Sequence, residues 1–390
     1  MATEDDNRST GVVTQAFADV QTAFDQYLQA DDGYSAQLCI YLGGEPVVDL
    51  VGGPHLRGDS LTGVYSATKG AAALAVASVI DAGALDLEAL VIDYWPEFGA
   101  NGKATVTVGD LLAHRAGLNA LDGRFTLEEL FDSRRGGGRL AAQVPLWKPG
   151  SAFGYHALTI GLLMEELVRR ATGRTLHDVF ENDVRAPRGA DFFIGLPESE
   201  DHRYVRVHDP VLTDAQRSEI RSRPPIDAIQ ELVFSNVDAP DDRGDDGTST
   251  NNARVRRAGP SAIGGVGSAR GLARLYADAL ATSPNPIASA ATFRAMAQQR
   301  SWGQDRTLNI PNCFGAVFML PQPRMPFGSF GAFGHDGAGG TLAFADPRTD
   351  LAFGYVPAPM QYPGGADARS IALARLARSI ARSSIEAPVG

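Results

Sequence analysis

The chain has 390 residues, a formal net charge of -11, a hydrophobic content of 44% and a charged content of 21%. This length exceeds what one hydrophobic core usually serves, so two lobes are expected, with the composition of an ordinary globular protein. The excess of negative charge argues against a nucleic acid or an anionic membrane surface as the partner.

Several classes of protein are excluded by what the sequence lacks. No apolar stretch reaches the length of a membrane span, and the acidic residues near the N-terminus do not follow the basic-then-apolar order of a secretory signal. Cys39 and Cys313 are too few and too far apart for a disulfide framework, so we expect free buried thiols and a cytoplasmic location. The phosphate-loop, His-Glu-x-x-His and Cys-x-x-Cys patterns are missing, so no metal and no cofactor is expected.

The N-terminal region combines one helix with two strands. Residues 1–12 are expected to form a frayed tail. An amphipathic helix is predicted from Thr14, because apolar residues recur at helical spacing, namely Phe17, Val20, Phe24 and Tyr27. Two strand-like runs, 36–42 and 46–51, flank Gly43-Gly44-Glu45, which predicts a hairpin.

A buried helix follows and carries the most informative pair of residues. The small and apolar run from Ala71 to Ile80 has no polar face, which is typical of a buried helix, and it should end near Gly83. Ser66 and Lys69 stand three residues apart at its start, so one helical turn places both side chains on one face. A hydroxyl beside an amine indicates an activated nucleophile, whereas the alternative is a serine N-cap with an incidental lysine.

The composition favours the chemical interpretation of this pair. The chain has three lysines among 35 basic residues, and it has 22 serines. With these counts, a serine three positions before a lysine is expected by chance roughly 0.17 times. Lysine differs from arginine in that it can lose its proton when desolvated and then serve as a base.

From about residue 85 to 259 the pattern changes to short helices and long turns. Thr107 and Thr126 are predicted helix caps, a helix over 158–172 should stop at Gly173, and 240–252 is predicted to be a solvated loop. The C-terminal part is predicted to contain helices and strands, with helices at 269–280, 288–298 and 366–384 and strands at 313–320, 331–334, 341–345 and 351–356.

This order of elements predicts an α+β fold. Consecutive strands joined by short turns favour an antiparallel sheet flanked by helices. The two strand-rich ends, 1–84 and 260–390, are predicted to share one sheet as a discontinuous lobe, with residues 85–259 inserted as a mostly helical lobe. The site is then expected in the cleft between the lobes.

Five short motifs, in the order in which they follow along the chain, resemble those of the serine β-lactamases and penicillin-binding proteins. The closest likeness is to the β-lactamase-like esterases, or family VIII carboxylesterases, and it covers the chain from about residue 35 onward. The motifs are Ser66-Ala-Thr-Lys69, Leu112-Ala-His-Arg-Ala-Gly117-Leu118, Pro149-Gly150 leading to Tyr155-His-Ala157, Gly264-Gly265-Val-Gly-Ser268, and His335-Asp336-Gly337-Ala338-Gly339-Gly340. The resemblance implies a β-lactamase/transpeptidase-like fold.

The resemblance also implies roles for individual residues. Ser66 matches the acylated nucleophile, Lys69 its motif partner and Tyr155 the tyrosine across the cleft. The backbone N–H groups of Ser66 and Ala338 are expected to form the oxyanion hole, and Gly337 fits a backbone that approaches a ligand closely. Lys69 and Tyr155 could share the proton transfers, with the ammonium favouring the phenolate, and which of them is the resting base stays open.

Two departures from the lactamase pattern bear on the substrate. Ala157 stands where lactamases commonly have asparagine, and His335 replaces the lysine of the third block, so a permanent positive charge is missing. Both changes favour neutral esters over lactams and peptides. His335 either hydrogen-bonds near Tyr155 and shapes the cleft or is a structural histidine, and Tyr155 itself has the alternative of a core tyrosine.

The sequence therefore predicts a serine hydrolase that cleaves small carboxylic esters through an acyl-enzyme on Ser66, and the resemblance implies short acyl chains. The alternatives are a β-lactamase or D-amino-acid peptidase, an acyltransferase, and a non-enzymatic sensor that is acylated and stops there. A cationic group facing the cleft beside His335 would favour the β-lactamase or peptidase. The oligomeric state is not predicted.

Overall fold

The computed structural model describes residues 8–238 and 247–386. Its main sheet has six antiparallel strands in the order β1-β3-β2-β14-β13-β12. Their bounds are β1 Thr10–Val13, β2 Ser35–Leu42, β3 Glu45–Gly52, β12 Phe333–Asp336, β13 Leu342–Asp346 and β14 Leu351–Ala358. The predicted antiparallel sheet is confirmed.

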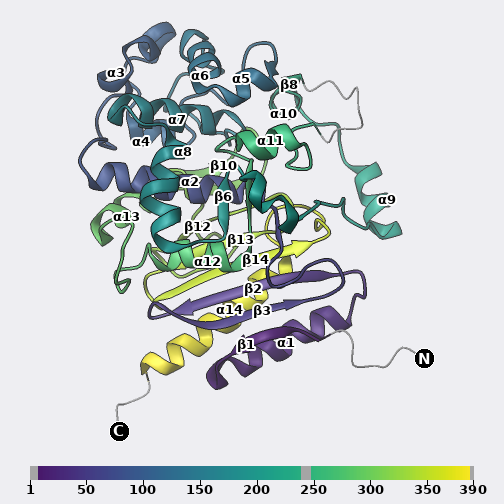
Figure 1. Cartoon of the computed structure of the whole chain (residues 1–390). Helices are drawn as coiled ribbons and strands as arrows, with labels where there is room; N and C mark the ends of the chain where they lie inside the picture. The colour runs from purple at the N-terminus through teal and green to yellow at the C-terminus, as the bar shows by residue number, and fades with distance from the viewer. Residues whose placement is uncertain (1–7, 239–246, 387–390) are drawn as a thin grey trace.

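Helices cover both faces of this sheet. Helices α1 (Ala18–Gln29) and α14 (Ala368–Glu386) pack together on one face, whereas α12 (Ala269–Ala277) and α2 (Ala67–Asp81) lie on the other (Figure 1). Strands buried on both faces are apolar along their whole length rather than alternating, and β14 is buried at every position.

The pairing of β2 with β14 joins the two ends of the chain. Its register runs from Ser35 opposite Ala358 to Leu42 opposite Leu351, so both strand-rich ends share one sheet as predicted. The hairpin turn between β2 and β3 is also confirmed, and Gly43 and Gly44 adopt the positive φ angles of 60° and 83° that it requires.

The expected frayed tail is wrong for its last residues. Residues 10–13 form β1, which pairs with β3 from Thr10 opposite Val51 to Val13 opposite Val48. These residues are mostly exposed, so no apolar pattern marks them as a strand. Backbone pairing along the edge of β3 holds them instead. Residues 1–7 lie outside the described part of the chain.

The helical region sits above the main sheet in Figure 1. Its α-helices are α3 Val91–Tyr94, α4 Val108–Leu112, α5 Leu127–Phe131, α6 Ser133–Ala142, α7 Thr159–Thr172, α8 Leu176–Val179, α9 Asp214–Ser222, α10 Ala228–Phe234 and α11 Ala253–Ala258. The caps at Thr107 and Thr126 and the stop at Gly173 are confirmed. The lobe boundaries at 84/85 and 259/260 remain a prediction. None of the described helices is long and apolar enough to cross a membrane.

In the part of the chain that the structure describes, eight short strands lie outside the main sheet and form one four-stranded and two two-stranded sheets. They are β4 Leu61–Gly63, β5 Phe125–Thr126, β6 Phe192–Ile194, β7 Tyr204–Val205, β8 Val237–Asp238, β9 Gly265–Gly267, β10 Ser301–Gln304 and β11 Pro311–Phe314. Strand β4 leads directly into the turn before α2. In its sheet β4 lies between β7 and β9 and pairs with both. Together they fix where α2 begins.

The single strand predicted over 313–320 is wrong. The chain leaves β11 at Phe314 and doubles back, so that Phe314 and Met319 face one another as a bridge. Tertiary contacts impose this reversal, because the N–H groups of Ala316 and Val317 donate to the carbonyls of Met296 and Leu112 at 2.7 and 2.8 Å. The α13 helix (Ala290–Met296) ends at one of these acceptors.

The strand predicted at 331–334 is displaced by two residues, to 333–336. It therefore includes His335 and Asp336, whose pairing with β13 runs from Phe333 opposite Ala345 to Asp336 opposite Leu342. The predicted loop over 240–252 lies partly outside the described residues. Its described part, 247–252, contains turns and ends at Asn252, which caps α11.

Candidate active site

A tight turn presents Ser66 at the start of α2. Tyr65, immediately before it, has a positive φ of 47°, which is uncommon for a bulky residue and marks a turn held by its surroundings. The hydroxyl of Thr68 donates to the Tyr65 carbonyl at 2.5 Å and accepts the Gly265 N–H at 2.9 Å. The turn is thus tied both to the first turn of α2 and to β9.

Lys69 lies one helical turn below Ser66 and is fully buried. Its Nζ is 2.9 Å from Ser66 Oγ and 2.9 Å from the Ala262 carbonyl oxygen, and it lies 4.9 Å from the centre of the Tyr155 ring. Burial lowers the pKa of the Lys69 amine to about 7, against the opposing effect of the Asp336 carboxylate. A substantial fraction of Lys69 is therefore a neutral amine at neutral pH.

Tyr155 is held by a carboxylate that the sequence did not indicate. Asp305 accepts the Tyr155 backbone N–H at 2.9 Å and two further N–H groups of its own loop, those of Thr307 and Leu308. The Tyr155 ring stacks on Phe314 with the centroids 5.9 Å apart. Asp305 follows β10 with no motif around it, and only the fold brings it to Tyr155.

Burial raises the pKa of Tyr155 well above its usual value, although the Ser66 hydroxyl acts in the opposite direction. The expectation that the neighbouring ammonium would favour a phenolate does not match this arrangement. Desolvation dominates for both groups, and it disfavours the charged form of each. Tyr155 therefore rests as a neutral phenol beside an amine that is partly neutral at neutral pH.

Two buried histidines hold the loop that carries Tyr155. The carbonyl of His114 accepts the Gly154 N–H and its Nδ1 accepts the His156 N–H, each at 3.1 Å. His156 in turn bonds the Gly154 carbonyl and the Leu118 N–H. Burial lowers the pKa of both histidines, so both stay neutral. His114 and His156 therefore shape the loop that carries Tyr155.

The third block brings a backbone segment against the Ser66 turn. A Cβ on Gly337 would lie 2.2 Å from the Val64 carbonyl oxygen, so only glycine permits this approach. The next residue, Ala338, lines the same cavity as Ser66. Among the described residues, no protein acceptor takes the backbone N–H of Ser66 or of Ala338. Two backbone donors are thus available beside the Ser66 hydroxyl.

His335 lies behind the cavity instead of lining it. Its Nδ1 donates to the Asp336 carbonyl at 2.7 Å, its ring centroid is 6.0 Å from that of Tyr155, and a Cβ on Gly70 of α2 would come within 3.0 Å of it. Burial lowers the pKa of His335 to about 3, so the ring is neutral. The sequence predicted that His335 would carry no permanent positive charge, and the lowered pKa agrees with this prediction.

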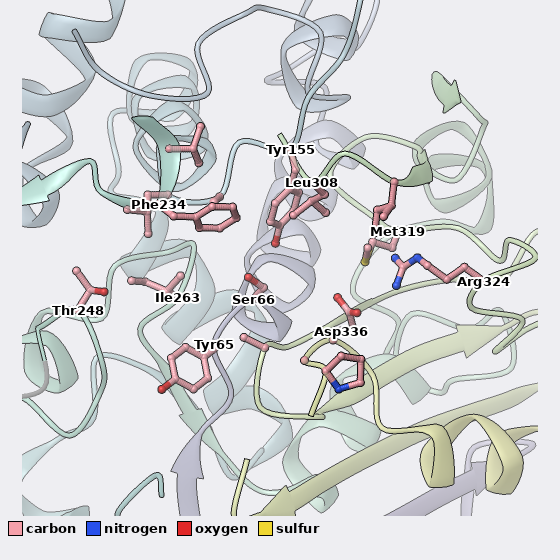
Figure 2. Close-up of a pocket in the computed structure, with 18 residues that line it drawn as sticks. Tyr65, Ser66, Tyr155, Phe234, Thr248, Ile263, Leu308, Met319, Arg324 and Asp336 are labelled. Atoms are coloured by element: carbon pink, nitrogen blue, oxygen red, sulfur yellow. The ribbon is translucent and has the colours of Figure 1, made fainter. Parts of the chain in front are cut away.

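Ser66 opens into a cavity of about 470 Å³. Figure 2 shows Tyr155 and Ser66 near its centre, Phe234 and Ile263 to one side, and Arg324 and Asp336 to the other. Most of its wall is apolar, formed by Ala157, Leu158, Val233, Phe234, Ile263, Leu308, Ile310 and Met319. Sequence reasoning missed Arg324 and the α10 side chains, because local spacing carries no signal for distant segments that meet in a cleft.

Comparisons with known proteins cover nearly the whole chain. A family model described as Beta-lactamase matches residues 20–377. The Esterase/beta-lactamase LipL of Mycobacterium tuberculosis is 33% identical over 374 residues, which span 90% of this chain and 82% of that protein.

Two solved structures are also similar. EstA from Arthrobacter nitroguajacolicus Rue61a has 44% identity and a TM-score of 0.87, with 96% of this chain and 98% of that chain covered. A family VIII carboxylesterase has 32% identity and a TM-score of 0.84, with 96% and 100% covered.

Proposed function

The chain belongs to the beta-lactamase family, and from this premise we propose that it is a serine carboxylesterase acting through an acyl-enzyme on Ser66. The observation that carries the proposal is the 2.9 Å contact between Ser66 Oγ and Lys69 Nζ, an amine whose pKa burial lowers to about 7. A serine hydroxyl becomes a useful nucleophile when such a base takes its proton.

In the proposed acylation step, Ser66 Oγ attacks the ester carbonyl and its proton passes to the Lys69 amine. The backbone N–H groups of Ser66 and Ala338 stabilise the negative oxygen of the tetrahedral intermediate, and such a donor is typically worth about 2.7–4 kcal/mol. When the ester bond breaks, the Tyr155 phenol donates its proton to the departing alkoxide. The Lys69 ammonium then reprotonates Tyr155.

Deacylation reuses the same groups. A water molecule in the place of the departed alcohol loses its proton to the Tyr155–Lys69 pair and attacks the acyl carbon. Ser66 leaves as the alkoxide and recovers a proton from the Lys69 ammonium, and the carboxylic acid is released. His335 packs on α2 and Gly337 approaches Val64 closely, and we infer that both support the segment that carries Ala338.

The neutral side chains around Ser66 support an ester as the substrate. Ala157 offers no amide, and neutral His335 offers no charge. A second candidate, β-lactamase activity, is favoured by one observation: Arg324 is a cation on the wall of the cavity, on the same side as Asp336. Small-molecule esters are the substrates proposed for the first candidate. The buried free thiols of Cys39 and Cys313 support a reducing, cytoplasmic location.

Turnover of p-nitrophenyl acetate, run beside nitrocefin, tests this proposal. We expect many turnovers of the ester, faster than of the lactam, and an acetyl group on the Ser66 peptide in acid-quenched samples analysed by mass spectrometry. A stable adduct without turnover would identify a sensor. Faster nitrocefin hydrolysis would identify a β-lactamase, and a new ester formed with an added alcohol would identify an acyltransferase.

The pH dependence should report Lys69 directly. Because its amine must be neutral to accept the Ser66 proton, kcat/KM for p-nitrophenyl acetate is expected to rise with pH and level off above a midpoint near the Lys69 pKa of about 7. The pKa values of His335 and His156, about 3 and 4, place both histidines outside this range. A profile that is flat from pH 6 to 8 would contradict Lys69 as the base.

A further inference from the structure

Arg324 occupies the polar end of the active-site cavity. It follows the reversal after β11, and its side chain lines the same cavity as Ser66. In Figure 2 the guanidinium group is turned toward the cavity, near Met319 and Asp336. The side chain is exposed, and it makes no hydrogen bond or ion pair with any residue that the structure describes.

Asp336, the acidic residue that lines the same cavity, does not occupy the donors of Arg324. Asp336 is mostly buried, and its Oδ2 accepts the Ala366 N–H at 3.0 Å. The charge of Arg324 lowers the pKa of Asp336 across the cavity, but burial raises that pKa and is the larger effect. The carboxyl group of Asp336 is thus held by the segment that precedes α14, and none of the five N–H donors of the guanidinium bonds a residue that the structure describes.

A planar guanidinium is well matched to one kind of ligand group. Its paired N–H donors fit the two oxygens of a carboxylate, and such charge-assisted pairs are stronger than neutral hydrogen bonds. Most of the remaining wall is apolar, so the substrate that fits it is an apolar ester with one anionic end. His335 is neutral, so the block that holds it supplies no cation for this purpose.

We propose that Arg324 binds a carboxylate carried by the substrate, so that the preferred esters, or lactams, are those with a free acid group away from the scissile bond. The proposal rests on the proposed function, because it names the substrate class of the same site. Under this proposal, the substrate carboxylate is recognised by a loop outside the catalytic motifs. The proposal also explains why a cation lines a cavity whose residues around Ser66 suit an ester.

Matched substrates test this. In the first pair, 4-nitrophenyl hydrogen glutarate carries a carboxylate on its acyl part and 4-nitrophenyl valerate is neutral. In the second, 4-acetoxybenzoate carries a carboxylate on its leaving group and 4-acetoxyacetophenone is neutral. For Arg324→Gln we expect kcat/KM to fall at least about tenfold for the anionic member of one pair, mainly through KM, and less than about twofold for its neutral partner.

Controls separate recognition from other effects. Arg324→Lys should recover part of the kcat/KM that Arg324→Gln loses for the anionic ester. Added salt should reduce the preference of the wild type for the anionic over the neutral ester. Arg348→Gln removes the same charge from an exposed turn outside the cavity, and it should change neither member. The pair that responds identifies which half of the substrate meets Arg324.

If Arg324→Gln lowers kcat/KM equally for the anionic and the neutral ester of a pair, Arg324 only balances the charge of Asp336. If kcat/KM falls for neither pair, Arg324 binds no part of the substrate. Either result overturns the proposal while leaving esterase activity established. If the wild type hydrolyses none of the four esters, the proposed function itself fails. Nitrocefin, whose ring carries a carboxylate, serves as the lactam probe and should show the same dependence on Arg324.

Discussion

Replacing Ser66 with alanine is expected to lower kcat/KM for p-nitrophenyl acetate by at least about 10⁴-fold, because loss of a serine nucleophile removes the covalent route altogether. The fold should survive the change. Ser66 is the N-cap residue of α2, but its side chain makes no cap hydrogen bond, so alanine sacrifices no helix-capping energy. Steady-state kinetics and circular dichroism on the same preparation measure both outcomes.

The matched control is Ser78→Ala on the same helix. Ser78 Oγ donates to the Ala75 carbonyl at 2.8 Å, near the other end of α2 and away from the cavity. Its activity should equal that of the wild type. If Ser66→Ala keeps full activity and forms no less acyl adduct, another residue is the nucleophile and the proposed mechanism fails.

The second large effect concerns Lys69. Lys69→Met should reduce kcat/KM by about 10²–10⁴-fold, the usual contribution of a general base, and Lys69→Arg should do the same because arginine stays protonated. The Ser66 hydroxyl remains in both variants, so residual acylation at high pH distinguishes them from Ser66→Ala. Activity that persists at neutral pH in Lys69→Arg would exclude Lys69 as the base.

Lys69→Met should also alter how folding stability depends on pH. In the wild type the unfolded chain binds a proton on Lys69 up to a pKa near 10.5, whereas the folded chain releases it near 7. The unfolded state therefore binds more protons between these values, and the free energy of unfolding rises with pH across this window. The rise should be smaller in Lys69→Met, as chemical denaturation at pH 7 and 9 can measure.

Lys103 is the control, because it is the chain's other fully buried lysine. Its Nζ donates to the carbonyls of Ala100 and Gln143 at 2.7 and 2.6 Å, and it does not line the cavity. Lys103→Met should leave kcat/KM unchanged but lower the free energy of unfolding by about 1–3 kcal/mol, since two carbonyls lose their donor. Comparison of the Lys69→Met and Lys103→Met variants thus separates a catalytic effect from an effect on folding stability.

The sequence predicted the parts of the fold that local pattern controls. The apolar run of α2, the glycines of the β2–β3 hairpin and the stop at Gly173 all act over a few residues, and all are found where expected. The union of the two strand-rich ends in one sheet was also predicted, as the simplest arrangement with the helical middle inserted between them.

What failed depends on contacts between distant segments. β1 is an exposed edge strand that only its partner β3 defines, and the reversal near Val317 is set by acceptors on two other elements. In the site, Ser66, Lys69 and Tyr155 were found through motifs, whereas Asp305 and Arg324 stand in no motif. The protonation states of Lys69 and Tyr155 were also not predicted, because they depend on how deeply each side chain is buried, and the sequence does not give that.

The pairing of β2 with β14 has a consequence for how the polypeptide is made. The paired residues Ile40 and Phe353 are about 310 positions apart, so at ribosomal rates of roughly 5–20 residues per second β2 waits about 15–60 seconds for its central neighbour. During that interval an apolar strand has one open edge, which is the kind of surface that recruits other chains. We therefore expect the N-terminal hairpin to be the segment most exposed to pairing with other chains until β14 has been synthesised.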